Sequence, residues 1–187
     1  MRALLALLVA AVAAGACVSS AAGSGGNYEF DGGTASERRQ VVAALDASTF
    51  DWGAIRSRMT IHIADDVETQ AGRGEIWLNS GLLGGERFAW GLIQHEFAHE
   101  VDYFLLDPAA RETLTSALGA TAWCYEVPGL RHDQYGCERF ASNLAWAYWP
   151  SKDNCLRPLT RADEAGSLPP ARFRALLARL LPQPFAS

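Results

Sequence analysis

The feature that most constrains the fold is the stretch of residues 86–106, which contains no proline and repeats apolar side chains at helical spacing. The apolar residues recur at steps of three and four, the period of an amphipathic α-helix. They are Trp90, Ile93, Phe97, Val101 and Phe104. A long helix with one apolar stripe has to bury that stripe against other elements. We therefore expect the chain to fold around this helix.

Two histidines, His95 and His99, lie four residues apart in this stretch. At 100° per residue they share one face of the helix, roughly 160° away from Phe97 and Val101. Imidazoles one turn apart can converge on one ion, and neutral imidazole suits zinc. Glu96 lies about 100° round the helix from His95, close enough to reach a metal-bound water. The HExxH pattern therefore predicts a zinc site on the face opposite the apolar stripe.

Two carboxylates are candidates for the third ligand. Asp102 shares the histidine face, but it lies about 10 Å along the axis from His95, too far for both to bind one ion. We expect Asp102 instead to hydrogen-bond a ligand histidine or a neighbouring chain segment and to orient it. Glu138 begins the apolar segment GCERFASNLAWAYW, where an unpaired charge would be costly, and is the predicted third ligand. Glu100 is expected to point into solvent.

The rest of the chain predicts a small sheet and four further helices. A capping box from Thr34 to Glu37 starts the first of these helices, and Asp107 and Pro108 start another in the N-cap and N1 positions. The predicted helices are 35–47, 108–118, 137–149 and 170–181, and the predicted strands are 59–63 and 72–79. Together these elements indicate a single α+β domain over residues 34–187. Its sheet is expected to lie beside the histidine helix and the helix that carries Glu138.

The N-terminal residues 1–17 follow the pattern of a secretory signal peptide, with one positive charge, an apolar run and then small residues. Residues 13–17 are similar to a bacterial lipobox, in which the cysteine is lipidated, although Ala14 stands where leucine is preferred. Residues 18–33 are predicted to be a flexible linker. We expect export, with two outcomes left open: a free secreted protein, or a cell-surface protein tethered to the membrane through lipidated Cys17.

Charge and cysteine content narrow the functional classes. The formal net charge of -5 comes from 16 basic and 21 acidic residues without blocks, so neither nucleic acid nor an anionic membrane surface is an expected partner. Outside the leader, Cys124, Cys137 and Cys155 remain, so at most one internal disulfide can form among them. The sequence does not choose the pair. A stapling disulfide is favoured over a metal role, because no CxxC spacing occurs.

The segment HEFAHEVD at 95–102, followed by ERFA at 138–141, resembles the gluzincin class of zinc metallopeptidases. The likeness is to the branch that includes the lethal-factor catalytic domain and the MtfA-type bacterial peptidases, and it spans residues 61–149. Metzincins fit less well, because Asp102 and Leu105 stand where that class has glycine and a third histidine. The resemblance implies a zincin-like fold.

The resemblance also implies an activity, the hydrolysis of bonds in a peptide or protein substrate. His95, His99 and Glu138 correspond to ligands of Zn²⁺. Glu96 corresponds to the base that takes a proton from the zinc-bound water and delivers it to the leaving amine. The alternative is a non-catalytic, zinc-stabilised surface or binding lipoprotein. A structural zinc site needs a fourth protein ligand and no base, so Glu96 favours an enzyme.

Two parts of such a site stay open at this point. The oxyanion of the reaction needs a hydrogen-bond donor besides the metal, and Tyr135 and His132, in the loop before Glu138, are the two candidates. An extended substrate is expected to pair with a strand edge, for which the strand around 75–79 is the candidate. His62 stands alone on the other predicted strand and is expected to be structural or exposed.

Overall fold

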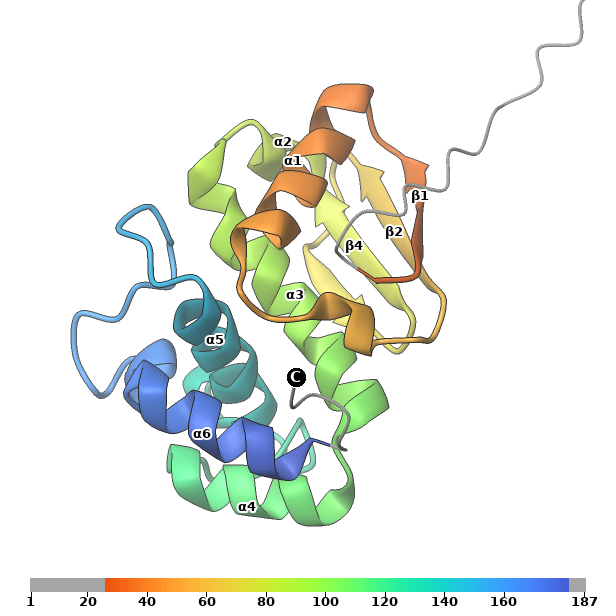
Figure 1. Cartoon of the computed structure of the whole chain (residues 1–187). Coiled ribbons are helices and arrows are strands. Elements are labelled where there is room, and N and C mark those ends of the chain that lie inside the picture. The colour runs from red at the N-terminus through yellow and green to blue at the C-terminus, as the bar shows by residue number, and fades with distance from the viewer. Residues whose placement is uncertain (1–25, 182–187) are drawn as a thin grey trace, which may run out of the picture.

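The computed structural model describes residues 26–181 of the chain; the predicted signal peptide, Cys17 and linker residues 18–25 lie outside this range. Within it the protein is a mixed α/β fold with a four-stranded sheet and six helices (Figure 1). The strands are Tyr28–Gly32 (β1), Met59–Ala64 (β2), Gln70–Gly72 (β3) and Glu75–Asn79 (β4). The helices are Ala35–Ala47 (α1), Ser80–Leu83 (α2), Arg87–Leu105 (α3), Pro108–Leu118 (α4), Gly136–Tyr148 (α5) and Pro170–Leu180 (α6). Three short 3-10 turns are Trp52–Ala54 (η1), His132–Gln134 (η2) and Glu164–Gly166 (η3).

The sheet has the strand order β1-β2-β4-β3. β1, β2 and β4 run parallel, and β3 runs antiparallel to β4. Between β3 and β4 the chain turns at Gly74, whose φ of 82° lies in the left-handed region that glycine adopts without strain. The predicted strand 72–79 therefore begins late, at Glu75, because Gly72 already pairs as the last residue of β3. β3 is consequently an edge strand, whereas β4 is paired on both sides.

Strand β1 occupies part of the predicted linker. Residues 28–32 pair with β2, and Tyr28 is buried with its ring 5.8 Å from that of Phe97. Tyr28 and Phe30 alternate with Glu29 and with an aspartate, which is the period of a half-buried strand. The flanking glycines hid this short pattern among linker-like residues. The linker prediction is therefore wrong for residues 28–32.

The predicted helices are confirmed to within one residue at each end. At the start of α1, Thr34 accepts a hydrogen bond from the backbone N–H of Glu37, whose carboxylate accepts one from the N–H of Thr34. Asp107 caps α4 by accepting the N–H of Ala110, and Gly119 ends this helix in the left-handed conformation. Local capping chemistry thus sets the ends of both helices.

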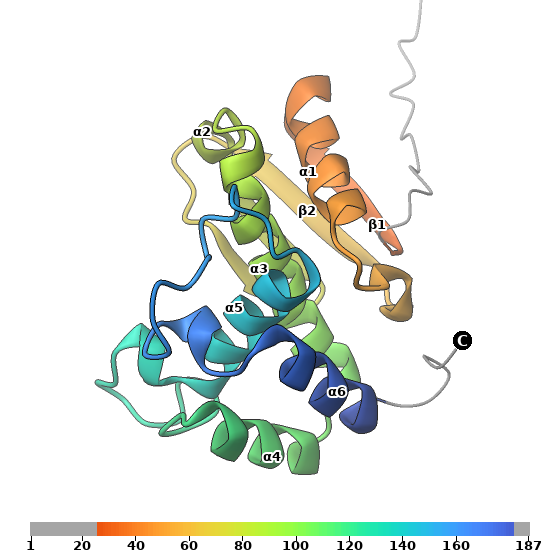
Figure 2. The same ribbon diagram turned by 60° about the vertical axis from the view of Figure 1, so that its left-hand side comes forward.

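α3 is the central element of the fold. It contacts α1, β3 and β4 on one side and α5 on the other, with α4 and α6 packed against α5 (Figures 1 and 2). Ile93, Phe97 and Val101 are fully buried. No helix among residues 26–181 is both long and apolar enough to cross a membrane. The fold therefore places the histidine face of α3 against α5, inside the protein.

Candidate metal centre

Three of the predicted site residues converge between α3 and α5. The Nε2 atoms of His95 and His99 lie 3.1 Å apart. The Oε2 atom of Glu138, in the first turn of α5, lies 3.2 Å from the first of these nitrogens and 3.3 Å from the second. All three residues are buried. Two helices that are distant in sequence thus bring two imidazoles and one carboxylate to a single point.

The separations fit ligands of one tetrahedral metal ion. When two ligand atoms lie 2.0–2.1 Å from an ion at the tetrahedral angle, they are about 3.3–3.4 Å apart. The three observed separations, 3.1, 3.2 and 3.3 Å, are close to this value. When both imidazoles carry their proton on Nδ1, the two Nε2 lone pairs face each other, and a cation between them removes that repulsion. The group could therefore hold a metal ion.

A hydrogen-bond chain fixes the orientation of His95. Its Nδ1 atom lies 3.1 Å from the hydroxyl of Ser142, which lies 3.0 Å from Oε2 of Glu164 in η3. Because an ionised carboxylate can only accept, Ser142 donates to Glu164 and accepts from the Nδ1–H of His95. The lone pair of His95 is then on Nε2, the atom that faces the other two donors. In metal-binding histidines, the ring nitrogen that does not bind the metal typically has such a hydrogen-bond partner.

A third histidine, His132, also contacts the carboxylate of Glu138. Its Nε2 is 3.0 Å from Oε2 of Glu138, and its Nδ1 is 2.6 Å from Oε1 of Glu164. Hydrogen bonds to these two carboxylates raise the pKa of His132 to about 10. Burial would raise the pKa of Glu138, but the hydrogen bond from His132 and the neighbouring imidazoles of His95 and His99 outweigh it and hold that pKa well below its usual range. His132 is more exposed than the converging donors, and it is not part of their group.

Glu96 faces the same cavity, which has a volume of about 270 Å³. The cavity is lined by Glu68, Thr69, Gln70, Ala71, His95, Glu96, His99, Tyr103, Cys124, Tyr125, His132 and Glu138. Glu96 is buried, and this burial raises its pKa, although the charges of His95 and His99 oppose the shift. A carboxylate with a raised pKa holds a proton more readily, as a group that takes a proton and returns it must do. The predicted base and the three predicted ligands therefore share one cavity.

Of the two predicted oxyanion donors, only His132 lines the cavity. Tyr135 is buried elsewhere, and its hydroxyl donates a hydrogen bond to the carbonyl of Val127 at 2.8 Å. The backbone of Tyr135 forms a bridge with Ala122, which keeps its side chain in the loop beside the cavity. Since its hydroxyl is already engaged there, the placement argues against Tyr135 as the donor.

Tyr125 is the site residue that the sequence analysis missed. Its hydroxyl donates to Oε1 of Glu138 at 2.8 Å, and its ring packs on that of Tyr135 with centroids 4.4 Å apart. Partial burial and this hydrogen bond raise the pKa of Tyr125. One signal could have found it: Tyr125 directly follows Cys124, just as Glu138 directly follows Cys137.

The cysteines form the expected single bridge. Cys124 and Cys137 are joined in a disulfide, and Cys155 is a free thiol. The sulfurs of Cys124 and Cys137 lie near a carboxylate oxygen of Glu138. Their disulfide bond excludes them as thiolate ligands. The prediction of one disulfide and one remaining thiol is confirmed for the described residues.

The carboxylates that follow His99 on α3 have structural partners. Asp102 accepts hydrogen bonds from Nε of Arg111 at 2.7 Å and from Nε1 of Trp123 at 3.0 Å. It therefore holds neighbouring chain segments, one of the two roles predicted for it. The prediction that Glu100 is solvated is wrong: it is fully buried and accepts the N–H of Gly74 at 2.8 Å, and burial raises its pKa to about 7. The turn between β3 and β4 covers this side of the helix.

No protein-family model matches the chain, and neither a curated protein nor a solved structure is significantly similar to it.

Proposed function

We propose that the protein is a zinc-dependent peptidase of gluzincin type that hydrolyses peptide bonds at the cavity between α3 and α5. The observation that carries this proposal is the convergence of His95, His99 and Glu138 within 3.3 Å of one another, with Glu96 in the same cavity. Two imidazoles and a carboxylate are a donor set that suits zinc, and three protein ligands beside a cavity are typical of catalytic sites. The small sheet beside α3 is compatible with a zincin-like domain.

Each residue of the cavity has a role in this proposal. Zinc held by the three donors would supply a Lewis acid that polarises the scissile carbonyl and lowers the pKa of a water molecule. Glu96 takes a proton on its carboxylate and returns it to the leaving amine. His132 would turn its Nε2–H from Oε2 of Glu138, which the metal then holds, to the carbonyl oxygen as negative charge develops on it. Glu164 holds the other nitrogen of His132 and so aims the ring into the cavity.

β3 is the strand that would pair with an extended substrate. Gln70 and Ala71 of β3 line the cavity, and β3 is the edge of the sheet. The sequence predicted this role for the strand at 75–79. β4 is paired with β2 and β3, so no further strand can be added to it along residues 75–77. A peptide added beside β3 would form main-chain hydrogen bonds close to the metal-binding residues.

The proposal is tested by zinc stoichiometry and peptide-library cleavage, measured on the same preparations. Glu96→Gln is expected to keep zinc and to lose turnover by about 10²–10⁴-fold, because it removes only the base. Glu138→Ala is expected to lose zinc. Glu112→Gln, on the exposed face of α4, is the matched control and should change neither quantity. Unchanged cleavage by Glu96→Gln would exclude the mechanism, and full zinc occupancy in Glu138→Ala would exclude the third ligand.

The same experiment separates the peptidase from the alternative function. Wild-type protein that carries one zinc but cleaves no peptide in the library would favour the non-catalytic zinc-binding module. Cleavage that depends on both Glu96 and zinc would favour the enzyme. Export, as a free or lipid-anchored protein, stays a prediction from residues 1–17.

A further inference from the structure

The disulfide joins the two chain segments that carry Tyr125 and Glu138. Cys124 directly precedes the tyrosine, Cys137 directly precedes the glutamate, and the two cysteine Cα atoms lie 5.3 Å apart. The residues that follow therefore leave neighbouring points of the backbone. Their side chains meet where the tyrosine hydroxyl donates to Oε1 of the glutamate, at 2.8 Å. Each half of the bridge is thus one residue away from one partner of this hydrogen bond.

The two partners differ in how firmly the rest of the fold holds them. Glu138 is buried in the first turn of α5, and the backbone N–H of Cys137 before it donates to the carbonyl of Trp123 at 2.9 Å. Tyr125 is 60% exposed and belongs to the exposed segment 125–129, which forms neither helix nor strand. Besides the disulfide at Cys124 and the hydrogen bond of its hydroxyl, Tyr125 packs its ring on that of Tyr135.

The backbone of Tyr125 is also strained. Its φ is 53°, in the left-handed region that a bulky side chain rarely adopts, because its Cβ comes close to the backbone carbonyl oxygen. Such a conformation persists only where the surrounding structure imposes it. The covalent bond at Cys124 restrains this backbone on one side, and the hydrogen bond that the carbonyl of Val127 accepts from the Tyr135 hydroxyl restrains it on the other. Without the disulfide, only the second restraint remains, and the chain can relax and carry the hydroxyl away from Glu138.

We propose that the Cys124–Cys137 disulfide positions Tyr125, so that the tyrosine hydroxyl holds Oε1 of Glu138 and directs Oε2 to the metal. Tyr125 is thus a positioning residue, and the disulfide acts on the metal site through it. The inference rests on the metal centre of the proposed function but does not require that the protein be a peptidase. Hydrogen bonds to the far side of metal ligands typically change metal affinity by 10–100-fold.

The test is a cycle of variants read out as zinc affinity, measured by competition with a chromophoric chelator. The variants are Tyr125→Phe, the double variant Cys124→Ala/Cys137→Ala, and the triple variant that combines them. Tyr125→Phe and the double variant are each expected to weaken zinc binding about tenfold, and the triple variant no more than either. Cys155→Ala and Tyr148→Phe are the matched controls, and both should bind zinc as wild type does.

Three outcomes would overturn the proposal. Unchanged zinc affinity in Tyr125→Phe would show that its hydroxyl does not support Glu138. Unchanged affinity in the double cysteine variant would show that the disulfide does not position the tyrosine. A triple variant weakened by the product of the two effects would show that they act independently. Each outcome is a binding result, so loss or absence of peptidase activity does not affect it.

A second form of the cycle covers a double cysteine variant that fails to fold, since loss of a native disulfide can prevent folding. Folded wild type and Tyr125→Phe are then compared before and after reduction with a water-soluble phosphine, with an osmolyte added so that the reduced proteins keep their far-UV circular dichroism. The freed thiols are alkylated with iodoacetamide, because Cys124 and Cys137 lie near Glu138 and could otherwise bind zinc themselves. The two sulfurs take up two electrons and two protons, while the phosphine becomes its oxide with oxygen from water. Reduction is expected to weaken zinc binding about tenfold in wild type and not in Tyr125→Phe. Equal weakening in both proteins would contradict the proposal.

Discussion

The two faces of α3 are both buried, but they differ in what they bury. The face towards the sheet and α1 carries Phe97 and Val101, whereas the face towards α5 carries His95 and His99. Burial of apolar side chains stabilises a fold directly. Burial of imidazoles and carboxylates costs free energy unless each group is paired. One side of this helix therefore supports the fold, and the other holds together polar groups that could bind a metal ion.

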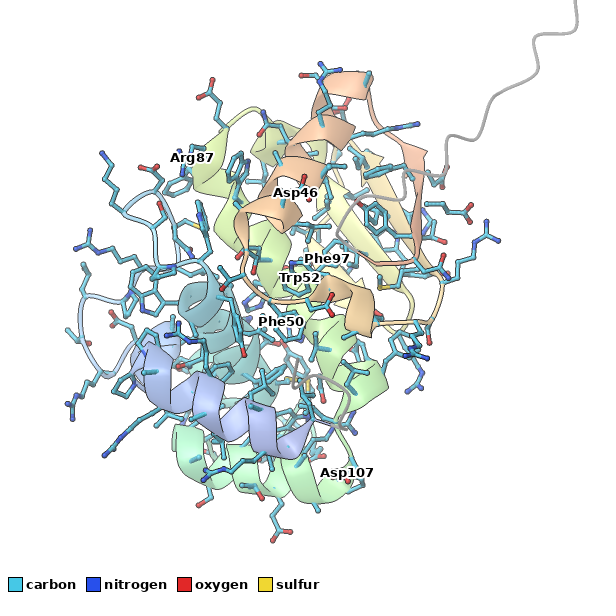
Figure 3. All side chains as sticks on the ribbon, in the orientation of Figure 1. Asp46, Phe50, Trp52, Arg87, Phe97 and Asp107 are labelled. Atoms are coloured by element: carbon cyan, nitrogen blue, oxygen red, sulfur yellow. A yellow bond between two sulfur atoms is a disulfide. The ribbon has the colours of Figure 1, made fainter. Side chains whose placement is uncertain are left out.

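The apolar side is closely packed around Phe97. This residue is fully buried, and the rings of Tyr28 and Trp52 lie edge-on to it with centroids 5.8 and 5.7 Å away. Figure 3 shows Phe97 and Trp52 together in the interior of the molecule. Since Tyr28 belongs to β1 and Trp52 to η1, one side chain of α3 joins three parts of the chain.

The largest expected effect is on this apolar side. Phe97→Ala should lower the free energy of unfolding by about 3–5 kcal/mol, because it removes buried contacts and leaves a cavity. The folded fraction should still bind one zinc, since the opposite face is unchanged. Phe88→Ala is the matched control, because Phe88 is 65% exposed on the same helix and should cost less than about 0.5 kcal/mol. Urea unfolding of the zinc-saturated proteins measures both changes, and equal losses would contradict the comparison.

A smaller effect is expected at Glu100, which α3 buries against the β3–β4 turn. Its pKa is raised from 4.5 to about 7, so between these pH values the unfolded chain loses a proton that the folded protein keeps. Wild-type stability should therefore fall as pH rises through this window, by about 2 kcal/mol. Glu100→Gln can still accept the hydrogen bond from Gly74 but has no proton to lose. Its stability relative to wild type should rise from pH 4.5 to 7.

Denaturant titrations across this pH range measure the difference, with Glu112→Gln as the exposed control. A difference between Glu100→Gln and wild type that does not change with pH would show that Glu100 is ionised in the folded protein throughout.

The smallest expected effect is at Ser142, on the polar side. Ser142→Ala removes the acceptor for the Nδ1–H of His95, and zinc binding should weaken about tenfold, or about 1.4 kcal/mol. Ser116→Ala removes an exposed hydroxyl from α4 and serves as the control. Competition with a metal chelator measures the affinity. Wild-type affinity in Ser142→Ala would show that the hydrogen-bond chain to Glu164 does not orient the ligand.

The sequence predicted those parts of this comparison that depend on local patterns. Helix ends followed from capping residues such as Thr34 and Asp107, and the two faces of α3 followed from the 3.6-residue period. Glu138 could be predicted because a carboxylate inside an apolar helix needs a partner. Its contact with the two histidines depends on how α5 packs against α3, and no local pattern in the sequence specifies that packing.

The residues that were not predicted correctly are those whose environment is set by segments distant in the sequence. Tyr125 reaches the site through a disulfide whose pairing the sequence could not choose. Glu100 was assigned to solvent from the geometry of its own helix, without the β3–β4 turn that covers it. β1 was missed because its short alternating pattern lies between glycines, and β3 because three residues are too few to show a period.

The central claim is that His95, His99 and Glu138 bind one zinc ion together. Anomalous diffraction at the zinc absorption edge, from crystals of the zinc-loaded protein, tests it most directly. The account predicts one peak, about 2.0–2.2 Å from Nε2 of each histidine and from Oε2 of Glu138. A peak bound by the two histidines and His132 without Glu138, or no peak between α3 and α5, would contradict it.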